Sequence, residues 1–180
     1  MKYLFLLLTI LIISCHPDKN KIVDRNKPVF KSNDASRLFF KNVRYLYYNI
    51  EEKNAGKIQV MKLKDRPEPD STKAQIFVNI INNWHQDKAY PMLEFSQYFN
   101  DRTEVKLEIR NKNSIVETLI FDKEAPISSH FYFSAALYEA ILKNHKIFLQ
   151  PENSELLKKE IAREAFRISM VDFYRLVAIY

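Results

Sequence analysis

The sequence predicts an α+β domain, with a mostly antiparallel sheet of about five strands, an N-terminal helix and C-terminal helices. One observation is the hairpin pattern at residues 105–121. Residues 105–110 alternate apolar and charged side chains, the period of a half-buried strand, and residues 111–114 form a turn into a second strand. The other observation is that apolar residues recur at helical spacing near both ends of the chain.

The first element is a predicted helix over residues 35–52, whose start Ser32, Asn33 and Asp34 could cap with side-chain oxygens. Its content of Tyr, Phe and Val leaves a strand as the alternative. The residues at helical spacing are Phe39, Val43, Leu46 and Ile50, with Phe40 and Tyr47 beside them.

Three strands are predicted to follow before the hairpin. Residues 57–64 form the first, and residues 75–82, which are apolar on both faces, form a central strand. Residues 83–88 then turn the chain into a strand at 90–95.

The second half begins with a predicted helix over 130–144 and a short extended piece at 147–150. Pro151 is expected to open a charged helix in which Glu155 and Lys159 are four residues apart. The last twenty residues are expected to form a helix with a break near Ser169, with a strand at 166–170 as the alternative. Two apolar faces support that helix: Leu157, Ile161, Ala165 and Ile168 on one side, and Phe166, Met170, Phe173 and Val177 on the other.

Composition excludes several enzyme sites that depend on glycine. The chain contains one glycine, Gly56. A phosphate-binding P-loop, a dinucleotide fingerprint and a nucleophile elbow each need at least two glycines. Turns are therefore expected to use Asn and Asp, which tolerate a left-handed backbone.

The net charge of the chain is +6, and the basic residues are interspersed with acidic ones. A solvated surface explains this pattern, and contact with anionic lipid headgroups is the alternative. Binding of nucleic acid would need a basic stripe and a recognisable module, so we expect no nucleic-acid partner.

The first fifteen residues have the pattern of an export signal. Lys2 precedes the apolar run of residues 4–13, which is shorter than the about 20 residues that span a bilayer. Ile12-Ile13-Ser14-Cys15 places a small residue directly before the only cysteine. This segment resembles the signal peptide and lipobox of bacterial lipoproteins. An ordinary signal peptide cut elsewhere, or an uncleaved anchor, is the alternative.

The resemblance implies cleavage before Cys15 and a covalent lipid on that residue. The domain plan is then a signal peptide at 1–14, a lipidated Cys15 with a flexible tether to residue 34, and one domain over 35–180. In the lipoproteins of well-studied enteric bacteria, an aspartate directly after the cysteine favours retention in the inner membrane. Because His16 stands there, the resemblance implies an outer-membrane lipoprotein of the cell envelope that faces the periplasm.

Lipidation of Cys15 would leave the mature chain without a thiol, which excludes disulfides and cysteine-based catalysis or metal sites. The histidines are His16, His85, His130 and His145, and no pair has the spacing of a helical zinc site. We therefore predict no metal, no cofactor other than the lipid, and no catalytic residue.

Trp84-His85-Gln86-Asp87 is the most chemically varied short segment. We predict a recognition loop formed by Trp84, His85 and Asp87, with the alternative that Trp84 fills the core and its neighbours cap the turn. Aromatic clusters at 131–133 with Tyr138, and at 45–48, suit core packing or an exposed binding surface.

These features predict a lipid-anchored envelope protein that binds another envelope protein through a sheet edge or an aromatic patch. A binder of a small glycan, lipid or peptide is the first alternative, and an immunity or inhibitor lipoprotein is the second. An enzyme would need His85 or His130 beside a carboxylate in a cleft.

Overall fold

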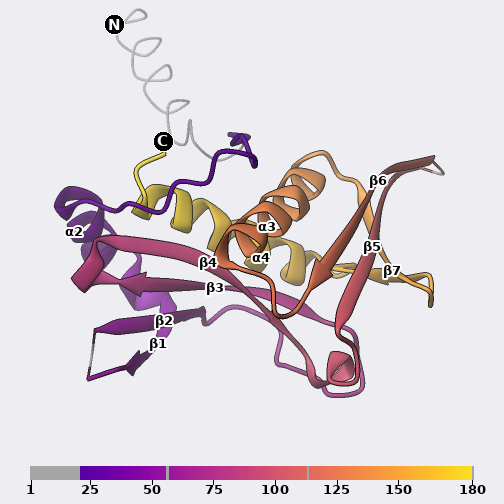
Figure 1. The fold of residues 1–180 in the computed structure, drawn as a ribbon, viewed down its shortest axis with the longest axis horizontal. Helices are drawn as coiled ribbons and strands as arrows, with labels where there is room; N and C mark the ends of the chain where they lie inside the picture. The colour runs from indigo at the N-terminus through magenta and orange to yellow at the C-terminus, as the bar shows by residue number, and fades with distance from the viewer. Residues whose placement is uncertain (1–20, 56, 113, 180) are drawn as a thin grey trace, which may run out of the picture.

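The computed structural model describes residues 21–55, 57–112 and 114–179. The predicted signal peptide, Cys15 and the chain up to residue 20 lie outside these residues. The described part contains two four-stranded antiparallel sheets and three α-helices. This confirms the α+β class with helices toward both ends of the chain (Figure 1).

The first sheet has the strand order β1-β2-β3-β4, with antiparallel pairing throughout. Strand β3 lies inside this sheet and is buried on both faces, as its apolar composition predicted. The strands are β1 (Tyr48–Lys53), β2 (Ile58–Leu63), β3 (Ile76–Asn83) and β4 (Lys88–Phe95).

The second sheet has the order β6-β5-β7-β8. The predicted hairpin forms its largest part, and the alternation in β5 is confirmed because Val105, Leu107 and Ile109 are buried. The strands are β5 (Glu104–Asn111), β6 (Ser114–Asp122), β7 (Lys146–Gln150) and β8 (Ser154–Leu156).

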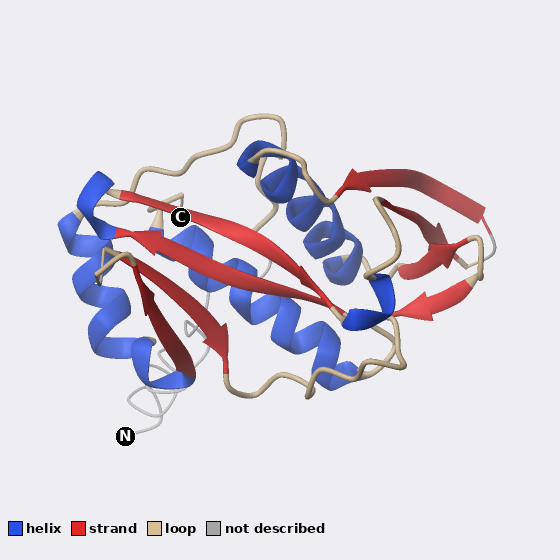
Figure 2. Cartoon of the chain, turned by 60° about the horizontal axis from the view of Figure 1, so that its bottom comes forward, coloured by secondary structure: helices blue, strands red, loops and turns tan. Residues whose placement is uncertain are grey.

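The three helices differ in their positions. α3 and α4 lie on one face of the β3–β4 pair (Figures 1 and 2). α3 also packs against β6 and β7, so it joins the two sheets, whereas α2 packs against α4 near one end of the molecule. The helices are α2 (Asp34–Val43), α3 (Ile127–Leu142) and α4 (Glu160–Leu176), with short 3₁₀ turns η1 (Tyr45–Tyr47), η2 (Trp84–Gln86) and η3 (Gln97–Phe99).

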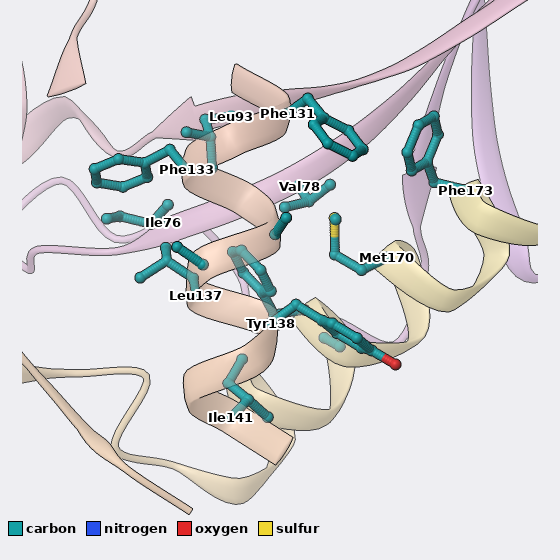
Figure 3. Close-up of a cluster of buried hydrophobic side chains, with 14 of the residues drawn as sticks. Ile76, Val78, Leu93, Phe131, Phe133, Leu137, Tyr138, Ile141, Met170 and Phe173 are labelled. Carbon is teal, nitrogen blue, oxygen red and sulfur yellow. The ribbon is translucent and has the colours of Figure 1, made fainter. Parts of the chain in front are cut away.

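A single cluster of buried side chains holds these layers together. Figure 3 shows part of it, where Phe131 of α3 lies near Val78 of β3 and Met170 of α4, and Leu137 points to the other side of α3 near Ile76. The predicted α4 face with Phe166, Met170, Phe173 and Val177 is the buried one. Among the described helices, none has the length and apolar content needed to cross a bilayer.

The N-terminal helix is shorter than the sequence predicted. It ends at Val43, and residues 48–52, the end of the predicted helix, belong to strand β1 instead. Of the Tyr, Phe and Val residues that left a strand as the alternative, only Tyr48 lies in this part. Pairing of β1 with β2 gives its backbone groups partners, so tertiary contact overrides the helical spacing.

The region after Pro151 also differs from the prediction. The structure has a turn and the short strand β8 there, and Glu155 pairs with Lys146 of β7 at 3.7 Å rather than with Lys159. α4 begins at Glu160 and runs without a break through Ser169, which is buried. With β1 and β8, and with β7 a true strand, the described residues form eight strands rather than about five.

Residues 21–33, which composition indicated as tether, contact the domain at several points. Lys31 bridges to Lys88 at the end of β4, and Phe30 packs edge-on against Phe131 with ring centroids 5.9 Å apart. Lys21 Nζ donates a hydrogen bond to the carbonyl of Ile179 at 3.1 Å.

Several turns depend on residues other than glycine. Eight described non-glycine residues have positive φ, and Asn54, Asp87, Asn144 and Asn153 are the Asn and Asp expected at such positions. The other four are Ala55, Lys112, Leu157 and Ala178, for which this backbone is costlier.

Candidate functional site

Strand β6 forms an edge of the second sheet. Among the described strands it pairs only with β5, so the backbone groups along its other side are not used by the sheet. An unpaired edge is a template for another strand, and natural proteins usually guard it with charged side chains or proline.

The side chains of β6 follow that rule only in part, since Glu117 and Asp122 are charged but three apolar side chains are exposed. Ile115, Val116 and Ile120 are 56%, 53% and 63% exposed, while Leu119 and Phe121 on the opposite face are buried in the core. The β5–β6 hairpin also projects beyond the body of the molecule (Figure 1). Strand β6 thus presents both an open backbone and apolar side chains to solvent.

A groove of about 560 Å³ lies beside this edge. We call it the β6 groove. Residues 117–122 of β6 line one wall, and Ser128, Ser129 and Tyr132 of α3 line another. Arg25 and Pro28 of the N-terminal segment complete it. The β6 groove has the length of a strand along one wall, a shape suited to an extended peptide.

Arg25 connects three parts of the β6 groove. Its Nη1 donates to Glu117 Oε2 at 2.9 Å, and its guanidinium carbon lies 4.9 Å from the centre of the Tyr132 ring. Tyr132, the ring of the 131–133 cluster that the core does not bury, is therefore covered by Arg25. The segment that leads toward Cys15 consequently forms part of this groove.

A second hollow, of about 720 Å³, lies between the loop before β3 and the start of α4. Ile76, Tyr98, Leu156 and Ile161 are among its apolar lining residues. Both charge signs surround it: Glu68, Asp70, Lys73, Glu155, Lys158 and Lys159. Hydrogen bonds from Lys73 and Thr72 hold the pKa of Asp70 below its ordinary value, which keeps this carboxylate charged at the rim.

The segment predicted as a recognition loop forms η2 at the turn between β3 and β4. Trp84 is 48% exposed, so the alternative in which it fills the core is wrong. The His85 ring packs edge-on against it at 6.2 Å. Asp87, in the left-handed region with φ of 51°, forms an ion pair with Arg37 of α2 instead of facing the other two.

The described histidines belong to different parts of the fold: His85 to η2, His130 to α3 and His145 to the turn before β7. His130 is buried, its Nδ1 accepts a hydrogen bond from the Leu93 amide at 3.1 Å, and its ring packs on Phe121. Burial lowers the pKa of His130 below its ordinary value, so the ring is neutral at pH 7. In the described residues no hydrogen bond or ion pair joins His85 or His130 to a carboxylate, and no group of three acidic, His or Cys side chains could hold a metal ion.

A buried ionic cluster joins the N-terminal elements to α4, and the sequence pattern did not reveal it. Asp172, 1% exposed, accepts hydrogen bonds from Arg44 Nε at 2.9 Å and from Tyr48 Oη at 2.8 Å, and Arg175 lies 3.5 Å away. Burial raises the pKa of Asp172, against the opposing effect of Arg44 and Tyr48, and burial also raises that of Tyr48. Because the cluster ties α2 and β1 to α4, we assign it a structural role.

Comparison with protein-family models, with curated proteins and with solved structures finds no match to this chain.

Sequence reasoning located β6 as a strand but missed that it is an edge. One signal was available in the sequence. Unlike β5, strand β6 has apolar residues at both odd and even positions: Ile115, Val116, Leu119, Ile120 and Phe121. A strand with both faces apolar suits either the middle of a sheet or a binding edge. Only the strand order decides between the two.

Proposed function

We propose that this protein is a lipid-anchored protein of the cell envelope that binds a partner protein at the open edge of β6. The observation that carries the proposal is an edge strand with an open backbone and exposed apolar side chains beside a groove. The partner would add an extended segment to β6, with its backbone paired to the strand and its side chains in the β6 groove.

The anchor supports this mechanism because it confines the domain to a surface. The resemblance of residues 1–15 to a lipoprotein signal would put a diacyl lipid on Cys15, and His16 after it favours the outer membrane. Confinement raises the effective concentration of the domain for a partner in the same membrane. A modest edge contact would then suffice for stable association.

Site-specific photo-crosslinking in intact envelopes tests the proposal. A photoreactive residue at position 120 should capture one envelope protein. The same residue at position 52 of β1, an edge strand with charged side chains, should not. Equal capture at both positions, or none at 120, would contradict the β6 site.

A charge substitution provides the matched functional control. Ile115→Lys adds the charge by which natural edges resist pairing, and we expect it to abolish capture of the partner through position 120. Because Ile115 is 56% exposed, the free energy of unfolding should change by no more than about 0.5 kcal/mol. Glu52→Lys on β1 should leave capture unchanged. The anchor is tested separately, since Cys15→Ser should abolish lipid labelling and leave the precursor uncleaved.

A second candidate, binding of a small ligand in the 720 Å³ hollow, is favoured by one observation. Leu157, which lines the hollow, has a φ of 49°, and a branched residue in this region costs about 1–2 kcal/mol. Backbone strain of this kind concentrates at functional sites. Native mass spectrometry of protein purified from envelopes should then detect a bound small molecule that Ala162→Trp, which fills the hollow, displaces. Identical spectra for both proteins would exclude this candidate.

A further inference from the structure

The apolar side of α2 and η1 faces solvent. Residues 38–47 carry five large apolar side chains that are between 42% and 61% exposed. Within α2 only Phe40 is buried. We call these five residues the α2 surface: Leu38, Phe39, Val43, Leu46 and Tyr47.

The attachment of α2 to the body holds this surface outward. Phe40 packs on Tyr48 with ring centroids 5.6 Å apart, and Arg44 pairs with Asp172 of α4. Ser36 Oγ donates to the carbonyl of Leu176 at 2.7 Å. These contacts all use one side of the helix, so its orientation is fixed and the apolar residues cannot turn inward. A sizeable exposed apolar patch of this kind marks an interaction site.

The α2 surface lies where the chain enters the domain. Lys21 bonds to the carbonyl of Ile179, three residues beyond the Leu176 carbonyl that Ser36 contacts. Six peptide units separate Cys15 from Lys21, and a fully extended chain of that length spans at most about 20 Å. A lipid on Cys15 would therefore keep this end of the molecule close to the bilayer.

The positive charge of the protein is concentrated in the same part of the chain. Residues 21–47 contain seven basic and two acidic residues, whereas residues 48–180 contain nineteen of each. Lys31 and Lys41 are exposed here, and Lys64, also exposed, bonds to the carbonyl of Leu46 at 2.8 Å. Both acidic residues of 21–47 form ion pairs, Asp24 with Lys27 and Asp34 with Arg37, and Asp87 also pairs with Arg37.

Apolar side chains flanked by lysines on a short helix are the pattern of a helix that lies in a membrane interface. Anionic headgroups attract such lysines within about a Debye length of the surface. We propose that the α2 surface lies on the anionic bilayer that carries the lipid of Cys15. This rests on the proposed lipid anchor, and it adds an orientation. Because α2 and the β5–β6 hairpin lie at opposite ends of the molecule (Figure 1), contact through α2 would direct β6 away from the membrane toward its partner.

Depth-dependent quenching in vesicles tests the contact. The lipidated full chain is reconstituted into vesicles of phosphatidylcholine and phosphatidylglycerol that contain brominated lipid. Since the lipid occupies Cys15, Asn42→Cys gives one thiol for a fluorophore in the middle of the α2 surface. Ser114→Cys does the same at the tip of the hairpin. We expect strong quenching at position 42 and little at 114.

Two double variants in the Asn42→Cys background test whether the apolar side chains of the α2 surface, rather than exposed apolar side chains anywhere on the protein, cause the quenching. Leu38→Ser with Phe39→Ser should remove most of the quenching. Ile115→Ser with Ile120→Ser, an equal loss of exposed apolar side chains at the other end, should leave it unchanged. Replacing phosphatidylglycerol with phosphatidylcholine should also weaken the quenching, because the lysines lose their partners.

The possible failures are distinguishable. If mass spectrometry shows the lipid on Cys15 and the protein floats with the vesicles, but position 42 is quenched no more than 114, the α2 contact is wrong and the anchor stands. A protein without lipid on Cys15 would overturn both the anchor and the contact that rests on it.

Discussion

Helices α2 and α3 are both rich in large apolar residues, yet the fold uses them in opposite ways. In α3, Phe131, Phe133, Leu137 and Tyr138 are all at most 2% exposed, because both sheets and α4 surround the helix. In α2, Phe40 is buried, while Leu38 and Phe39 beside it are about half exposed. Apolar content therefore indicates that a surface will be covered, but whether the cover is the protein's own core or an external partner depends on position in the fold.

The largest expected effect is a loss of stability when a buried ring of α3 is removed, compared with an exposed ring of α2. Phe131→Ala should lower the free energy of unfolding by about 3–5 kcal/mol, because it leaves a cavity among the packed rings of Phe30, Phe173 and Tyr174. Phe39→Ala on α2 should change it by no more than about 0.5 kcal/mol. Urea unfolding of the purified variants measures both. Similar losses from the two substitutions would show that the α2 surface is part of the core.

The second prediction concerns the attachment of α2 to α4. Arg44→Met should lower the free energy of unfolding by about 2–3 kcal/mol, because Asp172 is left buried without its main cationic partner. Adding Asp172→Asn to this variant should recover part of the loss, because no unpaired buried carboxylate remains. A double variant whose loss equals the sum of the two single losses would show that the two groups are not coupled.

The smallest predicted effect concerns His130, a buried polar residue of α3, and the pH dependence of stability. Burial lowers the pKa of His130 in the folded state from 6.5, so the unfolded chain takes up a proton first as the pH falls. The stability that neutral His130 supports is complete above about pH 6.5 and is lost progressively below it, until the pH has fallen through the lower pKa of the folded state. The slope from this one group cannot exceed about 1.4 kcal/mol per pH unit.

His130→Asn is the matched variant for that measurement. Its side-chain oxygen can still accept the hydrogen bond from the Leu93 amide, but it does not titrate. Thermal unfolding between pH 7.5 and 5.5 should show a shallower loss of stability for the variant than for the original protein. Parallel curves would mean that His130 does not contribute to the acid response.

Local patterns predicted the elements whose burial follows from their own periodicity. The clean alternation of β5 and the doubly apolar β3 were found because each strand buries the face that its sequence marks. The C-terminal face with Phe166, Met170 and Phe173 was found for the same reason. In contrast, residues 48–52 and 154–156 were assigned to helices, because their strand character comes from pairing with β2 and β7.

The candidate sites show the same division. The sequence contains Trp84, His85 and Asp87 within four residues, but the turn sends Asp87 to Arg37 and leaves Trp84 half exposed. The β6 groove is formed by Arg25, residues 117–122 and α3, which are far apart in the chain. No local spacing can predict a groove whose walls meet only after the sheet and helix have packed.

By itself, the sequence determined the α+β class, the central strand β3, the β5–β6 hairpin and the exclusion of glycine-dependent nucleotide sites. Each depends on periodicity or composition within a short stretch of chain. The tertiary structure alone decided that β6 is an edge, that Asp172 is buried between two arginines, and that the apolar side of α2 faces solvent. The physical reason is that burial is a property of neighbours in space. A helix or strand shows which of its faces is apolar, but only the packing of the whole chain decides which of those faces the protein covers.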